Sequence, residues 1–244
     1  MLPITLVAID TDPLALPLIR YAVERTLVGL NVTETLFFGT HPLNIGENFI
    51  RIAPFDSMDS YSEFVIKCLW PYITTEFMLI VQWDGFVTNP HLWEDEFLRY
   101  DYIGAPWPFY NDSMRVGNGG FSIRSQRLLQ SCKSPTFRRY PELKGGGAED
   151  VVICRIYRKA LESTGITFAP EDLAGRFSHE IGPYPGSTFG FHGPFNMPLN
   201  IPEKDLIVLA KPLRHRIHKG PILDAFIQNC RAMNYHGFVE IFEN

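Results

Sequence analysis

Apolar residues along the chain gather into short runs that alternate with longer stretches of helical periodicity. The short runs are rich in β-branched and aromatic side chains, which is typical of buried strands. Strands are therefore predicted at 4–9, 35–38, 50–52 and 77–82. Between them, apolar residues recur at helical spacing from Pro13 to Leu30, and Ser60 or Ser62 is placed to cap a helix that stops at Pro71.

The second half of the chain has a different character. The glycine-rich segment Gly117–Arg124 becomes strand-like at its end, and helices are predicted over 126–132 and from Asp150 to about Ser163. Strands alternate with helices in the first half, which predicts an α/β fold: a Rossmann-like, mainly parallel mixed sheet flanked by helices. No repeat or low-complexity linker interrupts the sequence, so residues 1–244 are expected to form a single domain.

Composition and charge exclude several classes of function. The chain has 244 residues, of which 45% are hydrophobic and 20% charged, as in ordinary globular proteins. Its net charge of −5 and the lack of a long basic run argue against nucleic acid as a partner. No apolar stretch approaches the roughly 18 residues that span a bilayer, and the first residues lack the basic start of a signal peptide. We therefore expect a soluble, cytoplasmic protein.

Two carboxylates follow strands of the predicted sheet. Asp10 ends the first strand, and Asp84, followed by Gly85, comes directly after the run at 77–82. Ligands of open α/β sheets bind beyond the carboxyl ends of the strands, which is where both side chains are expected. The glycine after Asp84 would allow a metal or phosphate to approach closely, although Asp-Gly is also a common turn dipeptide.

Three later segments contain further candidate groups. Gly117–Arg124 has three glycines within four residues, which either bring the backbone close to a ligand or form a tight turn. Glu149 and Asp150 follow a glycine run at the start of a predicted helix, where acids bind ligands or simply cap the helix. His192 lies among glycines and phenylalanines, either as a ligand or as a hydrogen-bonded loop histidine.

Taken together, the order of these elements resembles the GT-A glycosyltransferases. A closer resemblance is to bacterial GT-A-like proteins found among glycan-biosynthesis genes. The shared motifs are Leu-Val-Ala-Ile-Asp-Thr at 6–11, Gln-x-Asp-Gly at 82–85, Asn-Gly-Gly-Phe-Ser-x-Arg at 118–124 and Glu-Asp at 149–150, within roughly residues 4 to 195. The resemblance implies a nucleotide-sugar-binding half over about 1–115, an acceptor-binding and catalytic half over about 116–200, and a C-terminal extension over 201–244.

The resemblance also implies a role for each motif. Asp10 and Thr11 would lie near the base and ribose of a nucleotide. Asp84 would be the last residue of the family's Asp-x-Asp motif and would touch the metal and the diphosphate. Gly119 and Gly120 would let the chain pass close to the donor sugar. The remaining roles are a hydrogen bond to acceptor or donor hydroxyls for Glu149, general base for Asp150, and a further metal or diphosphate ligand for His192.

One position departs from this pattern, because Gln82 stands where the first Asp of Asp-x-Asp is expected. Its amide is neutral, so a divalent cation at Asp84 and His192, Mn²⁺ or Mg²⁺, would be bound weakly or not at all. The basic segment from Lys211 to Lys219 is another source of positive charge for a diphosphate. A solvated surface is the simpler explanation of the same segment, and a third is a peripheral contact with an anionic membrane that carries a lipid-linked acceptor.

These motifs predict an inverting glycosyltransferase of polysaccharide biosynthesis. It would transfer a sugar from a nucleotide-sugar donor, by default a UDP-hexose, to a hydroxyl of a glycan or lipid-linked acceptor, with Asp150 removing the proton. Gln82 keeps open a second interpretation, a non-catalytic nucleotide-sugar or carbohydrate-binding protein on the same scaffold. A glycoside hydrolase is disfavoured, since adjacent carboxylates do not straddle a glycosidic bond at a separation of about 5–9.5 Å. A nucleotidyltransferase is disfavoured too, since no basic glycine-rich loop follows the first strand.

Overall fold

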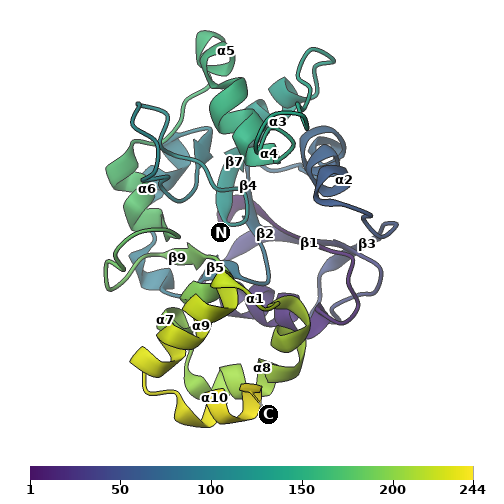
Figure 1. Cartoon of the computed structure of the whole chain (residues 1–244). Coiled ribbons are helices and arrows are strands. Elements are labelled where there is room, and N and C mark those ends of the chain that lie inside the picture. The colour runs from purple at the N-terminus through teal and green to yellow at the C-terminus, as the bar shows by residue number, and fades with distance from the viewer. Residues whose placement is uncertain (244) are drawn as a thin grey trace.

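The computed structural model describes residues 1–243, and a six-stranded sheet runs through its centre (Figure 1). The strand order is β3-β2-β1-β4-β7-β6; neighbours from β3 to β4 are parallel, whereas β7 is antiparallel to both β4 and β6. The strands are β1 (Leu2–Asp10), β2 (Val32–Gly39), β3 (Asn48–Arg51), β4 (Phe77–Val81), β6 (Tyr102–Ile103) and β7 (Ser122–Ser125). The expected α/β fold with a mainly parallel mixed sheet is confirmed.

A second sheet of three strands joins segments that are far apart in the sequence. Its order is β5-β9-β8, with β5 (Gly85–Val87) continuing from β4 after a short turn. β9 (Gly190–His192) runs antiparallel to β5, and β8 (Ser178–His179) runs parallel to β9. In this register His192 lies opposite Gly85. The pairing therefore brings the late histidine beside the end of β4.

Helices cover both faces of the central sheet. The α-helices are α1 (Leu16–Gly29), α2 (Met58–Glu63), α3 (Gln126–Cys132), α4 (Glu149–Val151), α5 (Arg158–Ser163), α6 (Glu171–Phe177), α7 (Met197–Asn200), α8 (Glu203–Arg216), α9 (Pro221–Ala232) and α10 (His236–Glu243). Short 3-10 helices occur at Trp70–Tyr72, Pro90–Leu92, Asp95–Arg99 and Pro194–Asn196. Turns of π-helix extend α2 over Phe64–Cys68 and α4 over Val152–Ile156.

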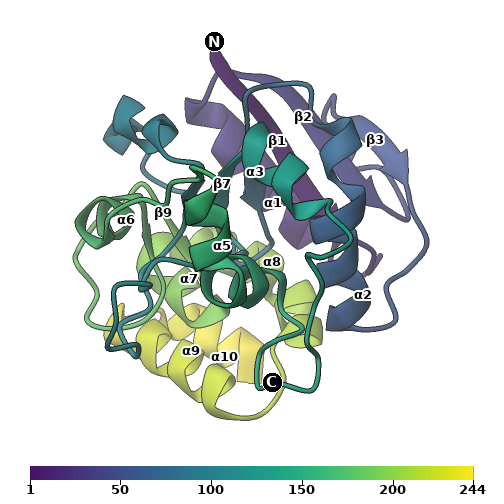
Figure 2. The ribbon, with the colours of Figure 1, turned by 90° about the horizontal axis from the view of Figure 1, so that it is seen from above.

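Alternating side chains of β1 divide the core between the two faces of the sheet. Leu6 and Ala8 point to one side, where they form a buried cluster with residues of α1 and of the C-terminal helices α8, α9 and α10. Val7 and Ile9 point to the other side, towards α2, its π-helical extension and α3. The helices α9 and α10 lie together, away from the edge strand β3 (Figures 1 and 2). The C-terminal extension is thus part of the main core.

Two of the predicted helices differ in detail from the expectation. Ser57, rather than Ser60 or Ser62, is the N-cap of α2: its hydroxyl accepts a hydrogen bond from Ser60 N, and its own N–H donates to Ser60 Oγ. The helix expected from Asp150 to about Ser163 is divided into α4, a π-helical turn and α5. Among residues 1–243, no helix combines the length and the apolar character that crossing a membrane requires.

Candidate functional site

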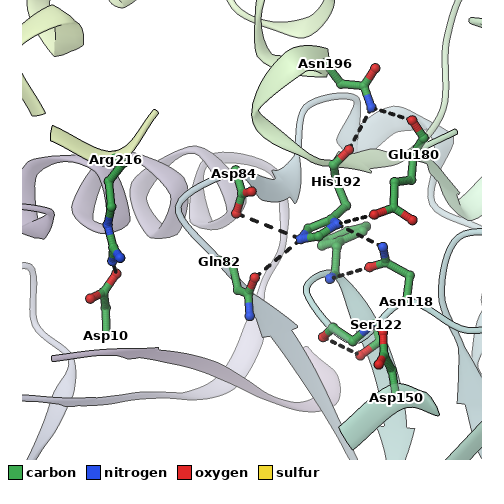
Figure 3. A network of polar contacts seen from close by, with 12 residues as sticks. Asp10, Gln82, Asp84, Asn118, Ser122, Asp150, Glu180, His192, Asn196 and Arg216 are labelled. Atoms are coloured by element: carbon green, nitrogen blue, oxygen red, sulfur yellow. Dashed lines mark hydrogen bonds and ion pairs between the residues drawn. The ribbon is translucent and has the colours of Figure 1, made fainter. Parts of the chain in front are cut away.

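A tight turn at the end of β4 carries the first candidate carboxylate. Gln82 and Gly85 exchange both backbone hydrogen bonds, at 2.8 and 3.1 Å, so Trp83 and Asp84 form the tip between β4 and β5. Asp84 is only 7% exposed, and its Oδ1 has no hydrogen-bond partner among the described residues. Burial raises the pKa of Asp84, and the nearby His192 opposes the shift. A buried carboxylate oxygen without a partner calls for an explanation, and this one is directed at the imidazole of His192 (Figure 3).

His192 reaches Asp84 because β9 pairs with β5. Its Nε2 lies 3.9 Å from Asp84 Oδ1 and 3.4 Å from Gln82 Oε1. Gln82 donates its amide to the hydroxyl of Tyr61 at 2.8 Å, which orients its carbonyl oxygen towards the ring. Burial would lower the pKa of His192, but the carboxylates of Asp84 and Glu180 outweigh burial and raise this pKa to about 9. With these neighbours the imidazole is cationic at neutral pH.

The other ring nitrogen is held by residues to which the sequence assigned no role. Nδ1 of the protonated ring donates to Glu180 Oε1 at 3.0 Å, and Asn118 Nδ2 lies 2.8 Å from the same nitrogen, to which it donates only when the ring is neutral. Asn196 donates to the backbone carbonyls of both Glu180 and His192, which ties the segment after β8 to the end of β9 (Figure 3). Burial would raise the pKa of Glu180, but His192 lowers it. Glu180 is therefore a carboxylate that fixes the orientation of the ring.

Glycines leave the space that these side chains occupy. A Cβ on Gly120 would lie 2.0 Å from His192 Nε2, and a Cβ on Gly85 would lie 2.7 Å from Cδ2 of the same ring. A Cβ on Gly119 would lie 1.7 Å from Glu149 Oε1. The family resemblance implies that Gly119 and Gly120 let the chain pass close to a donor sugar. The structure adds a second reason for glycine at both positions, because the side chain of Glu149 fills the space beside Gly119 and that of His192 fills the space beside Gly120.

Asp150 lies on the other side of this glycine pair from His192. Its Oδ2 accepts a hydrogen bond from Gly119 N at 3.0 Å, and its Oδ1 accepts one from Val151 N at 2.7 Å. The side chain is partly exposed at the start of α4. Burial raises the pKa of Asp150 to about 7, and the negative charge of Glu149 raises it further. The hydrogen bonds from Gly119 N and Val151 N lower this pKa but do not cancel the rise. A carboxylate with a pKa near neutrality suits a general base.

Glu149 is turned into the protein instead of towards the surface. It is buried, and its Oε1 accepts a hydrogen bond from Arg124 Nη2 at 2.7 Å. Arg124 is fully buried as well, and it also donates to Gly119 O at 3.3 Å and to Ser122 Oγ at 3.1 Å. These contacts connect α4 to the glycine segment. They favour a positioning role for Glu149, rather than the direct hydrogen bond to sugar hydroxyls that the family resemblance implies.

A cavity of about 370 Å³ opens beside the carboxyl end of β1, a size that suits a small organic ligand. Asp10 and Thr11 line it from β1, and Phe55 and Tyr61 line it with aromatic rings. Thr11 accepts a hydrogen bond from Phe55 N at 3.1 Å, which holds this wall against β1. Burial raises the pKa of Asp10, and an ion pair with Arg216 opposes the shift.

A second cavity of about 500 Å³ lies on the other side of Trp83. Asp84, Glu180 and His192 line it from the region where the two sheets meet, and residues 216–222, from the end of α8 to the start of α9, line it from the C-terminal extension. The basic segment of the sequence therefore has two environments. Lys211 is exposed, and Arg214 donates a hydrogen bond to the backbone carbonyl of Ile241. The residues from Arg216 to Lys219, in contrast, line the second cavity.

The donor atoms around Nε2 of His192 fit a divalent cation. Asp84 Oδ1 and Gln82 Oε1 lie 3.9 and 3.4 Å from Nε2, separations that suit ligands sharing one metal at about 2.0–2.2 Å. No group of three or more His, Cys, Asp or Glu in residues 1–243 is arranged to hold a metal, so this set depends on the neutral carbonyl of Gln82. A cation would also need the neutral imidazole, so it competes with the proton on His192.

The structure gathers most of the predicted residues into two adjoining groups (Figure 3). Asp84, His192, the glycine pair and Asp150 form one network, while Asp10 and Thr11 lie beyond Trp83. Sequence reasoning assigned no role to Glu180 and did not single out Arg216 within its basic segment. Neither is part of a local pattern, since Glu180 precedes an irregular loop and Arg216 is one of several basic residues on α8. The position of Asn118 directly before the glycine pair was the one usable signal.

Comparison with known proteins gives a family for this chain. Residues 45–192, more than half of the chain, match the family described as "Protein of unknown function (DUF5672)". The chain belongs to this family. The matched segment of this DUF5672 protein includes the Gln82–Gly85 turn, the glycine pair, Glu149, Asp150 and His192, and it excludes Asp10 and the C-terminal extension. No curated protein matches the chain.

Several solved structures are similar to this DUF5672 protein at low identity. One is a glycosyltransferase involved in the glycosylation of the major capsid of PBCV-1 (12% identity, 78% of this chain and 91% of that chain, TM-score 0.47). Another is a mannosyltransferase from Pyrobaculum calidifontis in complex with GDP-Man and Mn²⁺ (11%, 99% and 72%, TM-score 0.43). A third is A197 from STIV (12%, 64% and 78%, TM-score 0.37). All three TM-scores lie below 0.5, so these similarities assign no function to the chain.

Proposed function

We propose that this protein is a glycosyltransferase, which moves a sugar from a nucleotide-sugar donor to a hydroxyl group of an acceptor. The observation that carries the proposal is the position of Asp150. This partly exposed carboxylate, whose pKa is raised to about 7, is separated by the pair Gly119–Gly120 from the cluster of Gln82, Asp84 and His192. Sugar transfer requires a base on the acceptor side and a hydrogen-bond donor or a bound cation on the leaving-group side, and His192 and the oxygen atoms of Gln82 and Asp84 lie across the glycine pair from the base.

Asp150 acts as the general base in this proposal. It removes the proton from the acceptor hydroxyl as the oxygen attacks the anomeric carbon, and the bond to the nucleoside diphosphate breaks. Such assistance contributes roughly 10²–10⁴-fold to rate. Glu149 and Arg124 hold the start of α4 and the glycine segment together, so that the carboxylate of Asp150 keeps its place. Attack from the face opposite the leaving group predicts inversion at the anomeric carbon.

His192 and Asp84 belong to the leaving-group side. The Nε2–H group of His192 is the hydrogen-bond donor to the departing diphosphate, and Glu180 keeps the ring oriented through Nδ1. If a divalent cation binds at Gln82, Asp84 and His192, it supplies Lewis-acid stabilisation of the same charge. The cavity beside Asp10 and Thr11 would then take the nucleoside, with the aromatic rings of Phe55 and Tyr61 against the base.

The experiment that tests this function is a panel of nucleotide sugars screened for thermal stabilisation of the full-length protein, with and without Mn²⁺. Selective stabilisation by one donor is expected, since a ligand that binds only the folded state raises the melting temperature. The stabilising donor is then incubated with candidate acceptors, and the anomeric configuration of the product is determined. Inversion is the expected result. Retention would remove the assigned role of Asp150, and no response to any donor would end the proposal.

The second candidate function is a nucleotide-sugar or carbohydrate-binding protein without catalysis. Gln82 favours it, because a neutral amide at this position gives the cation site one carboxylate in place of two. The two functions differ in turnover. A binder is stabilised by its ligand but produces no free nucleotide and no glycoside, however long the incubation. UDP-hexose as donor, a glycan or lipid-linked acceptor and a peripheral membrane contact all stay predictions under either function.

A further inference from the structure

One arginine of the C-terminal extension, Arg216, lies in the wall between the two cavities. Arg216 is the last residue of α8, and among residues 1–243 only Arg216 and Trp83 line both the cavity beside Asp10 and the cavity beside His192. The guanidinium forms an ion pair with Asp10 (Figure 3). It also lies 5.8 Å from the ring of Trp83. A ligand that occupies both cavities at once must therefore pass Arg216.

The hydrogen-bonding capacity of Arg216 is not used up by these contacts. Its Nε is buried, lies 3.7 Å from Asp12 Oδ2, and has no hydrogen-bond partner among the described residues. Asp12 is already bonded to His215 Nε2 at 2.7 Å and to the backbone of Leu14. A guanidinium has five N–H donors in a planar fork that matches the oxygens of a phosphate. Nε itself faces Asp12, but the Arg216 side chain is 27% exposed and lines both cavities, so the rest of its fork is open to an anion there.

We propose that Arg216 binds the diphosphate of the donor, which makes the C-terminal extension part of the donor site. This inference rests on the proposed function. With the nucleoside beside Asp10 and the sugar towards His192, the linking phosphates lie at the wall formed by Trp83 and Arg216. Lys219 and His218 border the second cavity on the same loop and add donors on that side. On binding, the guanidinium exchanges part of its contact with Asp10 for phosphate oxygens.

The competing explanation is that Arg216 only neutralises the buried Asp10. The two explanations differ in which ligands lose affinity when the Arg216 side chain is removed. A neutralising role affects every nucleotide alike, whereas a diphosphate contact affects nucleoside diphosphates more than nucleoside monophosphates. The ratio of the two affinities therefore isolates the proposed contact from general damage to the cavity.

The test measures dissociation constants of UDP, UMP, GDP and GMP for the full-length protein by titration calorimetry in EDTA. Wild type is expected to bind the diphosphate of its preferred base more tightly than the monophosphate. Arg216→Ala should reduce this preference by roughly 10- to 100-fold, the range for charge-assisted hydrogen bonds. Arg216→Lys should keep part of it, because the charge remains and the fork is lost. Lys211→Ala, which removes one positive charge from an exposed position of the same helix, should leave it unchanged.

The outcomes distinguish a failure of the inference about Arg216 from a failure of the proposed function. If nucleotides bind wild type and Arg216→Ala keeps the full preference for the diphosphate, the inference fails while the proposed function stands. If wild type shows no preference in EDTA but gains one with Mn²⁺, the metal provides the recognition and Arg216 does not, which also overturns the inference. If no nucleotide binds wild type under either condition, the proposed function falls and the inference falls with it. Where Arg216→Ala does not fold, Arg216→Lys and the wild-type measurement in EDTA decide.

Discussion

Glu149 and Asp150 are neighbours in the chain but have different surroundings. Glu149 is buried against Arg124, which in turn contacts the carbonyl of Gly119. Asp150 is partly exposed and accepts the N–H of the same glycine. At the scale of single residues, one acid therefore holds the backbone while the other is available for proton transfer. The distinction comes from which way each side chain turns at the start of α4.

The role of Asp150 leads to the first prediction. Asp150→Asn is expected to lower kcat by about 10²–10⁴-fold, because the amide cannot accept the acceptor's proton, while the affinity for the donor changes little. Turnover is measured by release of nucleotide, and donor binding by calorimetry. Asp172→Asn is a matched control, since Asp172 also follows a glutamate as the second residue of a short helix but is exposed. A variant Asp150→Asn with wild-type turnover would falsify the assignment.

The pH dependence of the reaction is the second prediction. Because the raised pKa of Asp150 is about 7, the carboxylate form that accepts a proton predominates above this pH and is lost below it. The logarithm of kcat/KM is therefore expected to fall with a slope approaching one per pH unit as the pH drops below 7. The profile is measured between pH 5 and 9 at saturating metal. A flat profile from pH 5 to 7 would contradict a base with this pKa.

At the scale of elements, the site is built where two sheets meet. The Gln82–Gly85 turn ends β4 and begins β5, and the pairing of β5 with β9 sets His192 opposite Gly85. The glycine pair before β7 passes between this histidine and α4. Strand register thus decides the distance between Asp84 and His192, which are 108 positions apart in the chain. A shift of one residue in β9 would turn the imidazole to the opposite face.

The glycine pair can be tested directly. Gly120→Ala places a Cβ 2.0 Å from His192 Nε2 and 2.7 Å from Gln82 Oε1, so the ring must move. We expect a loss of about 1–3 kcal/mol in the free energy of unfolding and a marked fall in donor affinity. Gly175→Ala is the control: this glycine is inside α6, and its Cβ would meet only Pro106 at 3.9 Å. That change is expected to stabilise the helix by about 0.5–1 kcal/mol. Urea unfolding measures both variants, and equal stabilities would contradict the packing described.

At the scale of the whole molecule, the C-terminal extension belongs both to the core and to the site. Leu206, Leu209 and Leu213 of α8 are buried in the cluster that contains β1 and α1, together with Phe226 of α9 and Phe238 of α10. Arg216 and the loop that runs from it to Gly220 belong to the same extension, and they form part of the wall of the second cavity. Stability and ligand binding are therefore expected to depend on it together.

Truncation tests this dependence. A chain that ends at Pro202 exposes the apolar face of α1 and one face of the sheet, so it is expected to lose cooperative unfolding, whereas residues 1–244 should unfold in one transition. Calorimetry of both chains measures this. A truncated chain with a single transition near that of the full-length protein would show that the extension is a separate unit. It would also contradict the single-domain prediction.

The sequence by itself determined the strands of the parallel core, because apolar runs such as 77–82 must be buried wherever they lie. It also indicated the carboxyl ends of these strands, with Asp10 and Asp84, as the place for a ligand. It could not show that Glu149 turns inwards to Arg124, that Glu180 holds His192, or that Arg216 reaches Asp10 across 206 positions. Those contacts follow from strand register and from the docking of α8, which depend on the packing of the whole core and leave no local pattern in the chain.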